Sequence, residues 1–233
     1  MSSELVFRGG ATIAPLELTL SPRARVMRLR VDQRTGSVVL TMPRRASRRK
    51  ALEWAEGHRE WIERQLALVA PPQRLTAGAS VPLYDVPHVI DWNPDRSRVV
   101  RIEAGAILVG GPAEGLESRL LRWLKRHALD VLSRETEEFA AKAGVRVTHV
   151  AVGDPLSRWG SCSSSGAIRY SWRLILAPEF VRRATVAHEV AHRVHMHHGP
   201  DFHALVEELL GADPKPARLW LRRRGALLHR IAV

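Results

Sequence analysis

Apolar and polar residues alternate along three short stretches near the start of the chain, at 16–20, 26–31 and 37–42. A repeat of two residues places the apolar side chains on one face of an extended strand, so each stretch predicts a β-strand. Residues 32–36, Asp-Gln-Arg-Thr-Gly, are rich in turn-forming residues. The second and third strands are therefore expected to form a hairpin across this turn.

Two longer segments repeat their apolar residues at helical spacing. The first is predicted to begin at Ser47, a residue type that favours helix N-caps, and to run to about Leu68. The Pro71-Pro72 pair interrupts the pattern after it. The second helix is expected to span residues 113–143 and to stop at Gly144, because glycine commonly follows a helix.

Short apolar stretches punctuated by Pro, Asp and Gly lie between these two helices and predict further strands. They cover residues 80–84, 88–92, 99–103 and 106–109. Together with the first hairpin they predict a β-rich N-terminal region with one helix, residues 1–111. Gly110-Gly111-Pro112 marks the expected boundary, so residues 112–233 are predicted to form a second domain.

The second domain is predicted to combine strands with helices. Strands are expected at 145–152, 157–162 and 167–176, the last two as a hairpin. Pro178 is expected to open a helix, because proline is well tolerated in a first turn. Two further helices are expected, one of about ten residues from Asp201 to Gly211 and one from Pro214 onward.

The helix that Pro178 opens contains the sequence His188-Glu189-Val190-Ala191-His192. Residues four apart share a helix face, so His188 and His192 can present two imidazoles to one cation. Glu189 is about 100° around the helix from His188, close enough to take a proton from a water beside that cation. This spacing predicts the zinc site of a hydrolase, with two histidine ligands and a carboxylate base.

A third ligand is expected from the histidine-rich segment that follows, since six of the eleven histidines lie at 188–203. His195 is about 10 Å along a straight helix from His188, too far to share the ion. The chain must first leave the helix, and Gly199-Pro200 is expected to end it. His198 can then turn back. The competing candidates are His197, His203, Glu207 and Glu208.

Length and composition set the broad class of the protein. With 233 residues, 45% of them hydrophobic, the chain can bury a substantial core. No apolar run approaches the ~20 residues that cross a membrane, and the first residues lack the apolar stretch of a signal peptide. We therefore expect a cytoplasmic protein, and the single Cys162, which rules out an internal disulfide, agrees with a reducing compartment.

The formal net charge of +12 suggests an anionic partner, such as nucleic acid or an acidic polypeptide. Four arginines at the start of the first predicted helix, Arg44, Arg45, Arg48 and Arg49, are candidates for an anion-binding patch, where helix N–H groups and guanidinium groups meet a phosphate. The alternative interpretation is a solvated run of charge.

Four ordered motifs resemble the YgjP-like metallopeptidase family, which is related to the WLM and SprT-like zinc metalloproteases. They are Arg158-Trp159-Gly160-Ser161-Cys162, residues 168–178, His188-Glu189-Val190-Ala191-His192, and His198-Gly199-Pro200-Asp201-Phe202. The resemblance implies a small zincin-like domain of helices packed on a short mixed or antiparallel sheet. It also implies one zinc ion on His188, His192 and His198, with Glu189 as the base. The chain departs from the family at His203, where a Trp is usual.

The sequence therefore predicts an α+β zinc metallopeptidase that cleaves polypeptides and shows no membrane-spanning segment. The candidates for stabilising the oxyanion or contacting substrate are Arg158, Tyr170 and His203. Two alternatives stay open at this point. One is a metal-dependent phosphoanhydride or nucleotide hydrolase, and the other is a basic nucleic-acid-binding protein whose zinc is structural.

Overall fold

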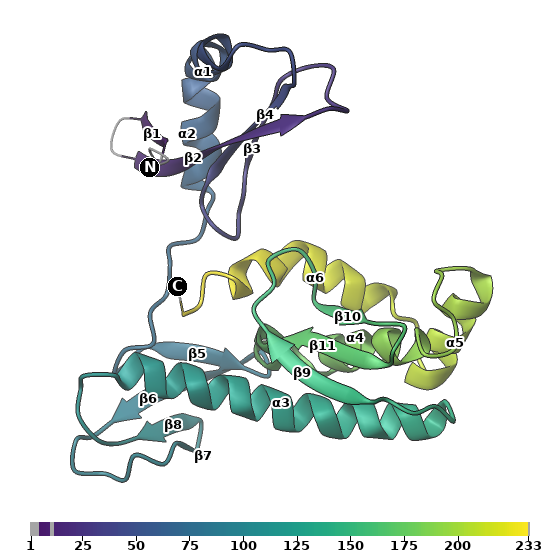
Figure 1. Ribbon diagram of the computed structural model, residues 1–233. Coiled ribbons are helices and arrows are strands. Elements are labelled where there is room, and N and C mark those ends of the chain that lie inside the picture. Colours follow the sequence, from purple (N-terminus) through teal and green to yellow (C-terminus); the bar gives the residue numbers. More distant parts are fainter. Residues whose placement is uncertain (1–4, 10–11, 233) are drawn as a thin grey trace. The chain divides into compact units, whose positions relative to one another are not determined.

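A computed structural model describes residues 5–9 and 12–232 of the chain. It divides into two compact units, Met1–Pro71 and Pro72–Val233, which we call the N-terminal and C-terminal units (Figure 1). The described residues form six α-helices and three small sheets. Each sheet contains both parallel and antiparallel strand pairs. The predicted α+β class with a β-rich N-terminal region is confirmed.

The N-terminal unit is built on a sheet with the strand order β1-β2-β4-β3. Its strands are β1 (Val6–Gly9), β2 (Thr12–Ser21), β3 (Arg28–Val31) and β4 (Val38–Pro43). The predicted hairpin is confirmed, because β3 and β4 pair antiparallel. The first predicted strand, at 16–20, is part of the longer strand β2. Strand β2 pairs parallel with β4, so these two strands end at the same edge of the sheet.

The helix predicted from Ser47 to Leu68 is two helices, α1 (Arg48–Glu56) and α2 (Arg59–Ala67). Ser47 occupies the N-cap position but makes no side-chain capping hydrogen bond. The two helices contribute to separate apolar clusters. Helix α1 packs Ala51 and Ala55 with Leu40 and Met42, whereas α2 packs Ile62 and Leu66 with Phe7, Ala14, Val31 and Val38. A break between the helices lets each one reach its own part of the sheet.

The C-terminal unit begins with the second sheet, whose strand order is β5-β6-β8-β7. Its strands are β5 (Ser80–Leu83), β6 (Val86–Trp92), β7 (Arg101–Glu103) and β8 (Ala106–Val109). The division of the chain therefore differs from the predicted one at 111/112. These strands share no sheet with the first hairpin. Their buried side chains, Val81, Leu83, Ile90, Ile107 and Val109, belong to the core of the C-terminal unit.

A long helix, α3 (Leu116–Lys142), runs from beside this sheet to the third one (Figure 1). The third sheet has the order β10-β11-β9 and consists of β9 (His149–Gly153), β10 (Gly160–Cys162) and β11 (Ala167–Ser171). Its antiparallel β10–β11 hairpin was predicted, but residues Trp172–Leu176 form a 3₁₀ helix rather than strand. All five of those side chains are buried, including that of Arg173, and a short, mostly apolar segment does not distinguish strand from buried helix.

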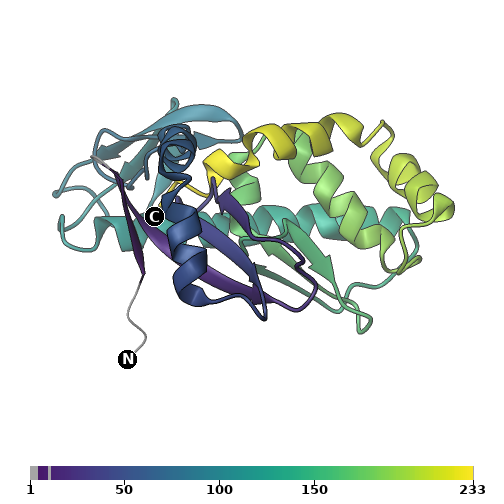
Figure 2. The ribbon, with the colours of Figure 1, turned by 90° about the horizontal axis from the view of Figure 1, so that it is seen from above.

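Three helices complete the unit: α4 (Glu179–Ala191), α5 (Pro200–Leu210) and α6 (Lys215–Leu228). Helix α4 contacts α3, α5, α6 and β10, so it lies at the centre of this unit (Figure 2). No helix in the described ranges is both long and apolar enough to cross a membrane.

A buried ion pair joins α4 to α3. The guanidinium of Arg182 donates to both carboxylate oxygens of Glu135 at 2.8–3.0 Å, and the two side chains are only 6% and 10% exposed. One turn away, Arg183 pairs with Glu138 on the surface of the same two helices. Water can solvate the Arg183 and Glu138 side chains when their pair is broken, but it cannot reach Arg182 and Glu135. Breaking the buried pair therefore costs more free energy than breaking the exposed one.

We expect Glu135→Ala to lower the free energy of unfolding by about 3–5 kcal/mol, because it strands the Arg182 guanidinium in the core. Glu138→Ala is the matched control on the same helix and should cost no more than about 1 kcal/mol. Urea unfolding of the full chain measures both. Equal small losses in the two variants would contradict the structural importance of the buried pair.

Candidate functional site

Helix α4 ends at Ala191, earlier than the end that Gly199-Pro200 predicted. His188 lies in its last turn, and His192 occupies the C-cap with helical backbone angles (φ −63°, ψ −14°). The two imidazole centroids are 5.0 Å apart. Pro200 instead begins α5, whose first turn it suits. The predicted pair of histidines therefore shares one face, although the helix around them is shorter than expected.

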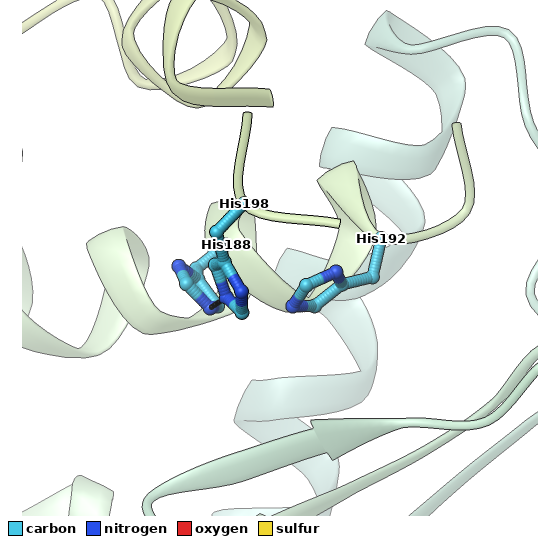
Figure 3. Close-up of side chains that lie close together, drawn as sticks. All are labelled: His188, His192 and His198. Carbon is cyan, nitrogen blue, oxygen red and sulfur yellow. Dashed lines mark hydrogen bonds between the residues drawn. The ribbon is translucent and has the colours of Figure 1, made fainter. Parts of the chain in front are cut away.

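His198 returns to this face from the loop between α4 and α5 (Figure 3). Its Nε2 lies 3.2 Å from Nε2 of His188. His188, His192 and His198 each offer a ligand atom, and these three atoms lie within 4.8 Å of one another. We call these residues the histidine triad. In the described part of the chain no other group of three or more His, Cys, Asp or Glu side chains meets this condition.

The ring of His192 is oriented by the loop that follows it. Its Nδ1 lies 3.1 Å from the carbonyl oxygen of His195, a geometry in which Nδ1–H donates. That tautomer leaves the Nε2 lone pair free for a cation, as in many histidine metal sites. His195, considered and rejected as a ligand from its position along the helix, thus contributes its backbone to the site.

Phe202 supports all three rings from the first turn of α5. Its ring centroid lies 4.9 Å from that of His188, 4.6 Å from His192 and 4.7 Å from His198, and its side chain is 1% exposed. No role for Phe202 was predicted. The signals for it were its place in the motif His198-Gly199-Pro200-Asp201-Phe202 and its position four residues after His198.

The surroundings of His188 and His192 favour neutral imidazoles. Burial, followed by the neighbouring His192 and His198, lowers the pKa of His188 to about 4. Burial also lowers the pKa of His192. Metal binding requires the unprotonated ring, so these residues are held in the form that coordinates a cation.

Glu189 is buried beside the triad and lies against strand β10. A Cβ added to Gly160 would come within 2.4 Å of its Oε1, so only glycine leaves room for the carboxylate there. Burial raises the pKa of Glu189 to about 7, and the positive charge of Arg158 opposes that rise. A carboxylate with this environment is suited to accept and return a proton near neutral pH.

A cavity of about 290 Å³ opens beside His188 and Glu189. Arg158 and His203 line it, and both side chains are exposed. Its apolar wall is formed by Trp159, Ala184, Val206, Pro214, Ala217 and Leu221. The cavity therefore offers an apolar wall together with polar side chains, among them Arg158, His203 and Arg218.

The other predicted residues of the C-terminal unit, apart from His203, are not part of the cavity lining. Tyr170 is fully buried and its hydroxyl lies 3.0 Å from Oγ1 of Thr136, so it faces the core beneath the sheet. Among the competing ligands, His203 has its ring centroid 6.4 Å from that of His198, and His197 is exposed outside the triad. The remaining two, Glu207 and Glu208, are exposed on α5. The arginines at 44, 45, 48 and 49 belong to the N-terminal unit.

The donor set fits a transition-metal ion. Two nitrogens that are each about 2.0–2.1 Å from a tetrahedral zinc lie about 3.3–3.4 Å apart. The 3.2 Å between the Nε2 atoms of His188 and His198 is close to that separation. Three imidazoles leave one position of a tetrahedral ion for another ligand, as catalytic sites require.

A family model described as YgjP-like, metallopeptidase domain, matches residues 25–224. The match extends over most of both units and includes the whole triad. Searches of curated proteins and of solved structures gave no match. The match establishes a metallopeptidase domain, which implies a metal ion and a polypeptide substrate.

We expect His198→Ala to reduce the metal content of the purified full-length protein to well below one ion per chain. His197→Ala, which removes an exposed neighbour, should leave the content unchanged. Elemental analysis after equilibration with limiting zinc and dialysis measures both. Full metal content in the His198 variant would remove that residue from the site.

Proposed function

The chain belongs to the YgjP-like metallopeptidase family, and from this premise we propose that it is a zinc-dependent peptidase with Glu189 as its general base. In this proposal His188, His192 and His198 hold one zinc ion. The observation that carries the proposal is the convergence of three ligand atoms within 4.8 Å beside a buried carboxylate.

Zinc suits this donor set better than the hard cations, because magnesium and calcium prefer oxygen ligands. When bound, zinc acts as a Lewis acid that makes water a better nucleophile and polarises a carbonyl group. The residues of the chain supply the remaining functions.

Glu189 accepts the proton that the attacking water loses as its oxygen bonds to the scissile carbonyl carbon. The same carboxyl then delivers that proton to the amide nitrogen as the C–N bond breaks. The products are a carboxylic acid and an amine, and transfer of the acid's proton to the amine gives a carboxylate and an ammonium group. Gly160 supports this role because it leaves space for the Glu189 side chain against β10. Arg158 and His203, which line the cavity, are the candidate donors to the developing oxyanion.

An extended peptide fits the surroundings of this site. Strand β10 is at the edge of its sheet. An open hollow of about 430 Å³ is lined by residues of β9, β10 and β11 and by Arg158 and Ser163. An edge strand can add a substrate strand through main-chain hydrogen bonds. This part of the proposal rests on analogy with other zincins.

The two alternative functions are less well supported. A nucleotide hydrolase needs several donors around each phosphate, whereas the cavity beside the triad has a mainly apolar wall, with Arg158 and Arg218 as its arginines. A purely structural zinc is usually closed by four protein ligands. Within the described residues the metal-ligand group contains three.

We expect Glu189→Gln to retain zinc and to lower the rate of peptide hydrolysis by about 10²–10⁴-fold, because the amide cannot act as a base. Zinc content and turnover of a fluorogenic peptide mixture measure the two properties on the same preparation. Nucleoside triphosphates are tested in parallel. Peptide turnover at the wild-type rate would exclude Glu189 as the base, and turnover of triphosphates alone would favour the nucleotide hydrolase.

The cavity wall should set the preference for the residue beside the scissile bond. Leu221→Ala enlarges the cavity and should raise kcat/KM for Phe-containing peptides relative to Ala-containing ones, whereas Leu221→Trp should lower that ratio by about tenfold or more. The same two changes at Leu219, 45% exposed on the same helix and outside the cavity, are the controls. Identical ratios in all four variants would place the substrate side chain elsewhere.

A further inference from the structure

The N-terminal unit gathers positive charge at one end of its sheet. Strands β2 and β4 run parallel and end together, with Ser21 opposite Pro43. Strand β3 starts at the same end, with Arg28 opposite Thr41. The β2–β3 loop and the connection from β4 to α1 therefore leave the sheet side by side.

All the charged residues in and around these two segments are basic. Residues 21–30 and 43–50 contain nine arginine and lysine residues and no acidic residue. We call eight of the nine the basic end, and all eight side chains are exposed. They are Arg23, Arg25, Arg28, Arg44, Arg45, Arg48, Arg49 and Lys50.

The charges of the basic end are hardly balanced within the described residues. Arg49 has the one ion pair found among the eight, at 3.7 Å to Glu53, and both of those side chains are more than half exposed. The first turn of α1 contains no acidic residue, and Ser47 does not cap it. The positive end of the helix dipole thus adds to the side-chain charges instead of being neutralised.

Such an arrangement opposes folding, because like charges repel and the helix N-terminus favours anions. A polyanion that brings several phosphates to this end would relieve the repulsion. Seven of the eight cations are arginines, whose planar guanidinium matches phosphate oxygens with two parallel hydrogen bonds.

We propose that the basic end binds double-stranded nucleic acid through its phosphate backbone, without sequence preference. Residues 21–30 and 43–50, which carry the basic end, contain no aromatic side chain to stack on unpaired bases, which argues against a single-strand site. They also lack the Trp or Phe that usually inserts a basic surface into a membrane. The inference concerns the N-terminal unit and does not depend on the proposed peptidase.

The test compares two full-length variants of equal net charge. The first changes six members of the basic end to Gln: Arg23, Arg25, Arg28, Arg44, Arg45 and Arg48. The control changes six exposed arginines of the C-terminal unit to Gln: Arg98, Arg101, Arg122, Arg126, Arg222 and Arg223. Neither set contains a residue with an ion pair among the described interactions, so both variants are expected to fold, which circular dichroism and thermal unfolding check.

Fluorescence anisotropy with a labelled 20-base-pair DNA or RNA duplex is measured between 50 and 200 mM salt. Each lost phosphate contact should reduce the slope of log affinity against log salt by about 0.9. We expect the first variant to lose several units of slope and at least about a hundredfold in affinity at 150 mM salt. The control should keep its slope within about one unit.

Three results would overturn the proposal. The first is a wild-type protein that does not bind either duplex at 50 mM salt. The second is an equal loss in both variants, which would show that only total charge matters. The third is binding of phosphatidylserine vesicles or polyglutamate that depends on the basic end, with no duplex binding. Binding to DNA alone or RNA alone supports the proposal and identifies the duplex.

Discussion

The geometry of the candidate site depends on one constraint, which is that the chain leaves helix α4 immediately after His192. In a continuous helix, His198 would lie about 15 Å along the axis from His188. The departure brings their Nε2 atoms to 3.2 Å. Arg193 holds the turn in place, because its guanidinium donates to the carbonyl oxygens of Arg146 and Ser164 at 3.2 Å each. The triad therefore depends on contacts with the third sheet as much as on its own spacing.

Close packing around α4 fixes the other half of the site. Val186, Ala187, Val190 and Ala191 are fully buried, so the helix cannot rotate to present another face without exposing them. Two glycines allow neighbouring elements to approach. Gly160 admits the Glu189 carboxylate, and a Cβ on Gly225 of α6 would come within 2.7 Å of the Trp159 ring. Trp159 is the sequence neighbour of Arg158 and Gly160, and its side chain lines the cavity. The contact between Gly225 and Trp159 therefore positions both α6 and this part of the cavity wall.

The sequence contained enough information to predict local features whose signals are short and strong. The His188–His192 spacing, the β3–β4 and β10–β11 hairpins and the long helix α3 all follow from residue periodicity or turn chemistry. The structure brings His198 to the other two histidines, an arrangement that helical spacing alone left open among five candidates. Choosing among them required the path of a loop, and that path is set by tertiary hydrogen bonds that have no sequence pattern.

Features that depend on long-range packing were predicted less well. The strands at 80–109 were grouped with the first hairpin because alternation reveals a strand but not its partner. The same limit applies to Trp172–Leu176, a mostly apolar segment with Arg173 within it, which fits a strand or a buried turn of helix equally well. The break between α1 and α2 was missed because the apolar stripe continues across it, although the two halves serve different clusters. Phe202 and Gly160 stand in the quoted motifs, but their roles became clear only from their neighbours in space.

The two proposed sites rest on separate apolar cores, and this separation has a physical consequence. The clusters around α1 and α2 contain only residues of the N-terminal unit, whereas the core around α3 and α4 contains only residues of the C-terminal unit. Substitutions in cores that share no residue are expected to act additively. Changes to the basic end and changes to the triad can therefore be separated by mutation. Within the described residues of the N-terminal unit, the exposed Arg49–Glu53 pair is the one ion pair that offsets any of the charge of the basic end. An external anion would supply the compensation that the unit's described contacts leave incomplete.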